Sequence, residues 1–167
     1  MESETIRENL PQRIERDTLI ELLPHKGKMF LLSRVTQYDT ESHTITSEYD
    51  ITPDCIFYED EADGVPTWAG FEFMAQGISA LTGITNKALA RRPRPGFILS
   101  VSKFKAVVPY LKSGTTIVMK IKEDYRSEMT YSYNCELFAS AADGEPAVST
   151  TITVMETEDI MNLFKDE

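Results

Sequence analysis

The longest apolar stretch of the chain predicts its principal helix. Residues 65–86 read VPTWAGFEFMAQGISALTGITN, which is apolar or small almost throughout, and Pro66 suits the first turn of a helix. Pro93 and Pro95 forbid the helix to continue beyond them. We therefore predict a helix from Pro66 to Arg92 that is buried on most of its sides.

Alternating apolar and polar residues predict about six strands before and after this helix. Turn signals at residues 112–114, KSG, and at Asp143-Gly144 separate the later strands, and such short connections imply antiparallel neighbours. A short helix from Asp17, its predicted N-cap, to Leu23 comes first. The predicted strands run from Met29 to Tyr38, His43 to Asp50, Phe97 to Val107, Thr115 to Asp124, Met129 to Ala139 and Ala147 to Met155.

Together these elements predict an α+β fold in which one sheet wraps around one helix. A single sheet buries one face, and the predicted long helix is the element able to cover it. Gly70, Gly77 and Gly83 make that helix slim, although a glycine inside a helix costs about 1 kcal/mol relative to alanine. Close wrapping by a curved sheet explains the slimness. The arrangement is the hotdog fold, in which two units usually pair side by side.

We expect residues 1–167 to form a single domain, with residues 1–16 as a candidate flexible segment. The length suits one core, and the N-terminus lacks the apolar centre of a signal peptide. No run reaches membrane-spanning length without polar interruption, so we expect a cytoplasmic protein with no membrane span. Cys55 and Cys135 have no neighbouring Cys or His, so we expect free thiols, no metal site and no cofactor.

Charge is distributed unevenly along the chain. The net charge is −10, but residues 87–126 carry ten basic residues and two acidic ones. This asymmetry suggests a polyanionic partner, while the overall negative charge argues against nucleic acid. An acidic acyl carrier protein or a coenzyme A thioester would suit, with Arg91, Arg92 and Arg94 as candidate docking residues. The alternative is a solvated face of strands with scattered lysines.

Glu72 is the one ionisable side chain in residues 65–86. Apolar surroundings rarely contain a carboxylate unless it is paired or needed for chemistry, because its desolvation is costly. We therefore take Glu72 as the candidate catalytic residue. The alternative is a structural carboxylate, paired with helix N–H groups or with an arginine across a dimer interface.

Three segments resemble signatures of the bacterial 3-hydroxyacyl carrier-protein dehydratases. LPHK followed by FLLSRV, within residues 23–35, is similar to the family's N-terminal signature, and KFKAVVP at residues 103–109 is similar to a later one. VP and FEFMAQ, within residues 65–76, resemble the start of the family's helix, which carries an acidic residue followed by AMAQ. The string WAGFEFMAQ looks most like the ApeP-type branch associated with aryl-polyene assembly.

The resemblance implies removal of water from acyl thioesters on a carrier protein, in fatty-acid or polyene biosynthesis. Glu72 would be the catalytic carboxylate, with Gln76 one turn later on the same helical face. The N–H groups of the first helical turn, near Thr67 to Gly70, would polarise the thioester carbonyl. Trp68, one turn before Glu72, is a candidate substrate-lining residue, and core packing is its alternative role.

The histidine of the family's catalytic loop has no counterpart in this chain. Its position falls on Tyr58, and the two histidines present are His25 and His43. We expect His43 at the surface, and His25 to pack against the core or begin a strand rather than to act in catalysis. For Glu72 to work in a dehydration, it must handle both proton transfers itself or be helped by Tyr58, His25 or water.

Three functions stay open, and each predicts a different outcome with thioester substrates. A dehydratase, which the three signatures favour, would remove water. A hotdog acyl thioesterase would use Glu72 to activate water and would release a thiol. A non-catalytic subunit, which the missing histidine favours, would pair with an active dehydratase. We favour the dehydratase, either as a homodimer or as a heterodimer with another hotdog protein.

Overall fold

The computed structural model describes residues 10–139 and 144–157. Residues 1–9 of the candidate flexible segment and Asp143 of a predicted turn lie outside the described residues. The elements are, in chain order, β1 (Ile14–Glu15), α1 (Arg16–Leu22), η1 (Gly27–Met29), β2 (Arg34–Asp39), β3 (Thr44–Asp50), β4 (Gly64–Pro66), η2 (Thr67–Ala69), α2 (Gly70–Ala88), β5 (Gly96–Ala106), β6 (Tyr110–Lys112), β7 (Thr116–Arg126), β8 (Thr130–Phe138) and β9 (Val148–Glu156).

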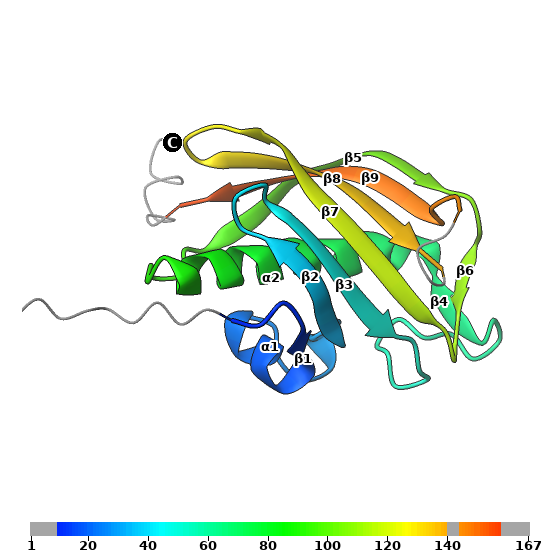
Figure 1. The fold of residues 1–167 in the computed structure, drawn as a ribbon. Coiled ribbons are helices and arrows are strands. Elements are labelled where there is room, and N and C mark those ends of the chain that lie inside the picture. Colours follow the sequence, from blue (N-terminus) through cyan, green and yellow to red (C-terminus); the bar gives the residue numbers. More distant parts are fainter. Residues whose placement is uncertain (1–9, 140–143, 158–167) are drawn as a thin grey trace, which may run out of the picture.

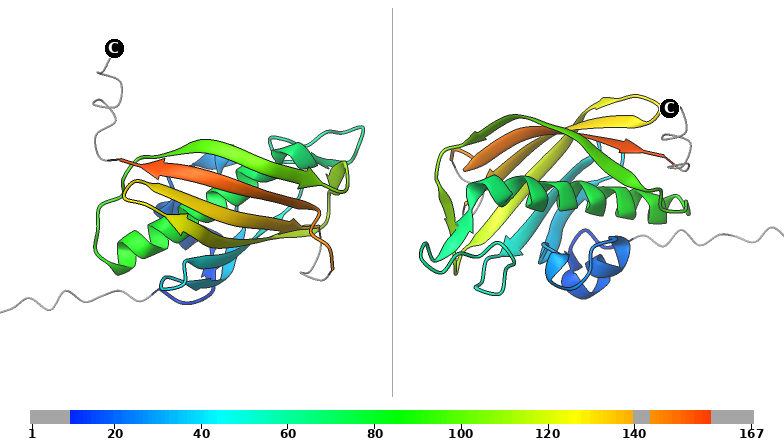
Figure 2. Two further views of the ribbon diagram at one scale, coloured as in Figure 1. Left: turned by 90° about the horizontal axis from the view of Figure 1, so that it is seen from above. Right: turned by 180° about the vertical axis from the view of Figure 1, so that it is seen from behind.

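Within the described residues, seven strands form one antiparallel sheet in the order β1-β2-β3-β7-β8-β9-β5. The sheet curves around α2, which lies along its inner face (Figure 1, Figure 2). Each of the six predicted strands has its counterpart, and β1 extends one edge by pairing with β2. The predicted α+β hotdog fold is therefore confirmed.

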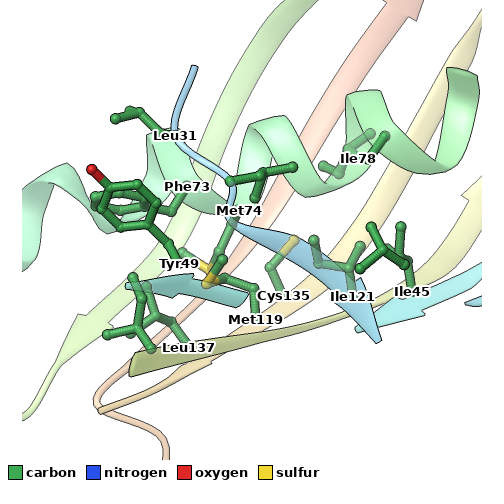
Figure 3. Packing of buried hydrophobic residues seen from close by; sticks show 14 of the residues in the cluster. Leu31, Ile45, Tyr49, Phe73, Met74, Ile78, Met119, Ile121, Cys135 and Leu137 are labelled. Carbon is green, nitrogen blue, oxygen red and sulfur yellow. The ribbon is translucent and has the colours of Figure 1, made fainter. Parts of the chain in front are cut away.

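The core lies between α2 and the sheet. Met119 and Ile121 of β7 and Leu137 of β8 are buried, and they pack in one cluster with Met74 of α2 (Figure 3). A Cβ atom at Gly77 would collide with the end of Ile121, so this glycine lets the helix approach the sheet closely. The predicted link between a slim helix and a wrapping sheet holds at this position.

The start of α2 is held by two short strands that the sequence pattern does not reveal. Within the described residues, β4 and β6 pair in a separate two-stranded sheet. Pro66 ends β4 and the 3₁₀ turn η2 follows, so the α-helix begins at Gly70 rather than at Pro66. Three-residue strands are too short for an alternating pattern to appear.

The end of the long helix also differs from the prediction. The α-helix stops at Ala88 rather than at Arg92. Ala90 has a φ of 51°, and the N–H groups of Ala90 and Arg91 donate back to carbonyls of the last turn at 3.2 and 2.8 Å. This Schellman arrangement satisfies the carbonyls that a helix end exposes. Arg91 and Arg92 therefore lie beyond the helix.

The N-terminal elements need two corrections. α1 begins at Arg16, so Asp17 lies in its first turn, and the cap position is Glu15, whose side chain makes no capping bond. β2 begins at Arg34 rather than at Met29. The Met29 carbonyl and the Leu31 N–H bond to the side chain of Gln76 in α2, and of the described residues in this segment only Ser33, directly before β2, donates its N–H to β3, at Glu48.

β5 forms an open edge of the sheet. Within the described residues it pairs with β9 alone, and two β-bulges interrupt that pairing. A long edge strand with exposed apolar side chains is a template for pairing with another chain. These side chains are Phe97, Ile98, Leu99, Val101 and Phe104, each between 37% and 52% exposed.

Among the described residues, no helix is both long and apolar enough to cross a membrane. In the same part of the chain, no group of three or more His, Cys, Asp or Glu side chains is placed to hold a metal ion. Cys55 and Cys135 are free thiols, and both are buried.

Candidate active site

A groove with a volume of about 430 Å³ follows one face of α2. It extends along the helix from Glu72 to Asn86, a span of about 21 Å at 1.5 Å per residue. The other walls come from the segment after α1, from the start of β5 and from the end of β9. The lining side chains include Glu72, Ala75, Ser79, Thr82 and Asn86 of α2, with His25, Phe97, Ile98 and Val154 from the other walls.

Glu72 and His25 line this groove together. Glu72 is half-buried in the first turn of α2, and His25 lies in the segment between α1 and η1. Burial lowers the pKa of His25 from its ordinary value of 6.5; the Glu72 carboxylate opposes this shift, and the Lys26 ammonium adds to it. The imidazole is therefore neutral at pH 7 and can accept a proton.

His25 is half-buried and does not stand at the start of a strand. Its Nδ1 atom is buried and has no hydrogen-bond partner among the described residues. A buried polar atom without a partner lowers the stability of the fold, so it is unusual in a residue with only a packing role. The sequence signal for His25 is its place in the LPHK signature, but its distance from Glu72 along the chain hides their proximity in the fold.

Tyr58 occupies the position at which the 3-hydroxyacyl carrier-protein dehydratases have the histidine of their catalytic loop. It does not line the groove. Its hydroxyl donates to the Asp63 carboxylate at 2.6 Å. This bond raises the pKa of Tyr58 to about 12. The phenol is thus a weak acid that is already engaged in its own loop, and its role as a helper of Glu72 stays a prediction.

The candidate residues at the helix start lie outside the groove lining. Thr67 donates its hydroxyl to the Val108 carbonyl at 2.7 Å and its N–H to the Pro109 carbonyl at 3.0 Å. The Gly70 N–H donates to the Thr67 carbonyl. These two N–H groups are therefore engaged within the protein, and their part in polarising a thioester stays a prediction.

Trp68 is 57% exposed. Its ring meets the Phe57 ring edge-to-face, with 5.8 Å between the ring centres. A side chain this exposed is not packed in the core, which was the alternative role for this tryptophan. Trp68 does not line the groove of Glu72, so its role in substrate binding also stays a prediction.

Gln76 is completely buried one turn after Glu72. Its side-chain oxygen accepts from the Leu31 N–H at 2.7 Å, and its side-chain nitrogen donates to the Met29 carbonyl at 2.8 Å. Both ends of the amide are thus bonded to the backbone that follows His25. The predicted contact of Gln76 with substrate has no support in this geometry.

The three candidate docking arginines lie at the end of α2 away from Glu72. Arg91 and Arg94 line a small hollow there with Arg126. Arg94 also lines the groove of Glu72, whereas Arg92 is exposed and lines neither. We call Arg91, Arg92 and Arg94 the basic group. Arg94 of this group lines both the small hollow and the groove of Glu72.

Two solved structures with similar chains support the fold. The dehydratase heterocomplex ApeI:P from Xenorhabdus doucetiae contains a chain with a TM-score of 0.77 at 20% identity, over 88% of this chain and 97% of that one. A hypothetical thioesterase with coenzyme A from Streptococcus pneumoniae gives a TM-score of 0.56 at 10% identity, over 74% of this chain and 84% of that one. At such identities the likeness establishes the hotdog fold.

The sequence also matches known families directly. The 3-hydroxyacyl-[acyl-carrier-protein] dehydratase FabZ of Chlamydia pneumoniae is 29% identical over 100 residues, which are 58% of this chain and 65% of that relative. The match thus spans less than two thirds of the relative's length. The model of the ApeP-like family, described as ApeP dehydratase, matches residues 18–165. The chain therefore belongs to the ApeP-like dehydratase family.

Proposed function

We propose that this chain removes water from 3-hydroxyacyl thioesters carried by an acyl carrier protein, with Glu72 as its working carboxylate. The observation that carries this proposal is that Glu72 and His25 line one groove. Family membership supports the same reaction. The groove is long enough, at about 21 Å along α2, to hold an extended acyl group.

Dehydration requires a base for the proton next to the thioester carbonyl and an acid for the departing hydroxyl. The neutral imidazole of His25 suits the first task, since burial lowers its pKa. The electrons of the broken C–H bond form the new double bond, and the C–O bond breaks. The hydroxyl takes a proton from the His25–Glu72 pair and departs as water. The Glu72 carboxylate stabilises the imidazolium formed in between.

The carrier protein is inferred from charge. Arg91 and Arg92 lie just beyond α2, and Arg94 lines the groove itself. Cations at the border of a groove attract an acidic carrier and orient it before its thioester enters. A coenzyme A thioester, which bears phosphates, is the alternative source of the same acyl group.

A second hotdog chain would complete the assembly along β5. The exposed apolar residues of this edge lie beside the groove, and Phe97 and Ile98 belong to both. A partner on this edge would cover the groove and exclude water from it. We expect a copy of this chain or another hotdog protein in this place.

The second candidate function is a non-catalytic subunit of such an assembly. It is favoured by Tyr58, which replaces the family's loop histidine and is bonded to Asp63. In this case an active hotdog partner would supply the catalytic groups.

The test is to give the purified protein a 3-hydroxyacyl thioester and a saturated acyl thioester, each on a carrier protein. Water loss from the first with no thiol release from either supports the dehydratase. Thiol release would identify a thioesterase. If neither reaction occurs but the protein restores or raises the activity of a hotdog partner, the chain is the non-catalytic subunit.

A further inference from the structure

The segment that carries His25 is fixed to α2 at two points. We call residues 22–31 the strap. The strap leaves the end of α1, passes through His25 and η1, and ends at Leu31, shortly before β2. In Figures 1 and 2 the N-terminal elements that include it lie against one side of α2.

The first fixed point is Gly83. A Cβ atom at this position would collide with the backbone carbonyl oxygen of Leu22. The absent side chain therefore lets the beginning of the strap rest directly on the helix. A backbone atom cannot move aside as the end of a flexible side chain can, so the distance between helix and strap is tightly set here.

The second fixed point is Gln76. Its buried amide holds the Leu31 N–H at 2.7 Å and the Met29 carbonyl at 2.8 Å. Gln76 and Gly83 are seven positions apart on α2, so the two fixed points are separated by about 10 Å along the helix axis. His25 lies on the strap between them.

Local hydrogen bonds make the strap stiff between these points. The Lys26 ammonium donates to the carbonyls of Leu23 and Ile20. The Met29 N–H donates to the Lys26 carbonyl at 3.2 Å, and this bond closes the turn that follows His25. A displacement of Met29 is therefore transmitted to the backbone of His25.

The ring of His25 lacks the usual means of orientation. A functional histidine is ordinarily held by a hydrogen bond to its second nitrogen. The buried Nδ1 of His25 has no such bond among the described residues. The position of the ring in the groove therefore depends on the backbone that carries it and on the packing around it.

We propose that Gln76 and Gly83 are positioning residues that hold the strap so that His25 faces Glu72 across the groove. This role rests on the proposed function, because His25 and Glu72 need a fixed relation only if they share proton transfers. Gln76 then acts through the strap rather than by contact with substrate. It would explain why a completely buried amide is placed one turn after the candidate catalytic carboxylate.

The titration of His25 reports on its position. Glu72 of α2 and Lys26 of the strap act on its charge, and Arg94 and Glu156 line the same groove. The chain has two histidines, so imidazole signals in NMR spectra of the full protein are few, and His25→Ala identifies the signal of His25.

Gln76→Met keeps the size of the side chain and removes both hydrogen bonds, and Gly83→Ala inserts a methyl group under the strap. Each should raise the titration midpoint of His25 toward 6.5, since a looser strap exposes the ring to water. Gln76→Glu, whose protonated carboxyl can make both bonds, should have a smaller effect than Gln76→Met.

Matched controls separate positioning from general stability. Thr150→Val removes a buried 2.7 Å hydrogen bond to the Ser102 carbonyl, away from the strap. Gly77→Ala inserts a methyl group on the core face of the same helix, against Ile121. Both should lower the melting temperature and leave the His25 midpoint in place.

The proposal is overturned if the His25 midpoint is unchanged in the strap variants that fold, whatever their loss of melting temperature, because both residues would then be simple structural contacts. It is equally overturned if the controls move His25 as far as the strap variants do. The signals are recorded without substrate. A displaced His25 in a chain without turnover would contradict the proposed dehydratase alone, whereas an unmoved His25 in an active chain would contradict the positioning role alone.

Discussion

At the scale of single residues, the groove brings together two ionisable side chains whose charges influence each other. Burial lowers the pKa of His25, and the Glu72 carboxylate acts in the opposite direction. The neutral form of His25 is thus present at pH 7 and is lost only as the pH falls through a pKa below 6.5. An activity that needs the neutral imidazole should fall over the same range.

This balance can be measured in the folded protein. The His25 titration midpoint should lie below 6.5, and in Glu72→Gln it should lie lower still, because the substitution removes the charge that raises the pKa of His25. NMR titration of the imidazole provides both values. A midpoint at or above 6.5 in the unaltered protein would contradict the burial of His25. A rise of the midpoint in Glu72→Gln would contradict the effect of the Glu72 charge on it.

The two candidate helpers of Glu72 should behave differently. His25→Ala should lower turnover of a 3-hydroxyacyl thioester by about 10² or more, the usual scale of a general acid–base group. Tyr58→Phe should leave it within about twofold of the unaltered rate, because the phenol is bonded to Asp63 and does not line the groove. Initial rates with both variants decide the matter, and the reverse order would make Tyr58 the helper.

At the scale of elements, the end of α2 sets the position of the basic group. Ala90 adopts a left-handed conformation at the point where the helix stops, and the three arginines follow within four residues. A residue other than glycine is strained there, since its Cβ approaches the backbone. The helix end is thus fixed by its hydrogen bonds at some cost in conformation.

Ala90→Gly should therefore stabilise the protein by about 1 kcal/mol, because glycine adopts this conformation without strain. Urea unfolding followed by circular dichroism gives the value. Ala88→Gly, two residues earlier and inside the helix, should have the opposite sign. Destabilisation by Ala90→Gly would show that the left-handed turn does not persist in solution.

Charge reversal tests the docking role of the same region. Arg91→Glu together with Arg92→Glu should weaken binding of an acidic carrier protein by about tenfold at low salt, and less at high salt, because exposed charges act through a screened field. Lys120→Glu with Lys122→Glu, on exposed positions of β7, makes the same change of charge elsewhere. Equal effects of the two pairs would point to net charge rather than a docking surface.

The sequence predicts those strands and helices that are long enough for an alternating or helical pattern of apolar residues to appear. β8 alternates along most of its nine residues, and in β7 the buried Met119 and Ile121 alternate with the exposed Lys120 and Lys122. β1, β4 and β6 have three residues or fewer and carry no such signal. The apolar run after Met29 also has the pattern of a strand, but its backbone bonds to Gln76, which lies far along the chain and leaves no local signal.

The site is predictable only in part for the same reason. Glu72 stands out from its sequence neighbours as a lone carboxylate in an apolar helix. His25 has no such contrast within LPHK, and its importance depends on the strap that folds back onto α2. A contact between distant segments leaves no local pattern, so the partner of Glu72 emerges from the fold.

At the scale of the whole molecule, β5 is an unpaired edge of the sheet in the described part of the chain, where we expect a second chain to bind. Its apolar side chains are exposed along the strand, and its first residues also form a wall of the groove. Edges of this kind are normally paired or covered. Assembly along β5 would thus protect the edge and enclose the site in one step.

The unaltered chain should form an assembly of two hotdog chains that depends on this edge. Leu99→Glu with Val101→Glu places charge on β5 and should dissociate it, whereas Tyr125→Glu, at an exposed position of β7, should not. Light scattering on the chain alone, and on the chain mixed with another hotdog protein, distinguishes a homodimer from a heterodimer. A chain that stays monomeric in both conditions would contradict the assembly.

The most direct measurement is the rate of water loss from a 3-hydroxyacyl thioester on its carrier protein, with the unaltered chain and Glu72→Gln compared side by side. Glu72→Gln keeps the shape of the side chain and removes its charge, so the variant should fold and assemble like the unaltered protein. We expect water loss with the unaltered chain and a rate lower by about 10² or more with the variant. Equal rates, or no water loss from the unaltered chain, would contradict it.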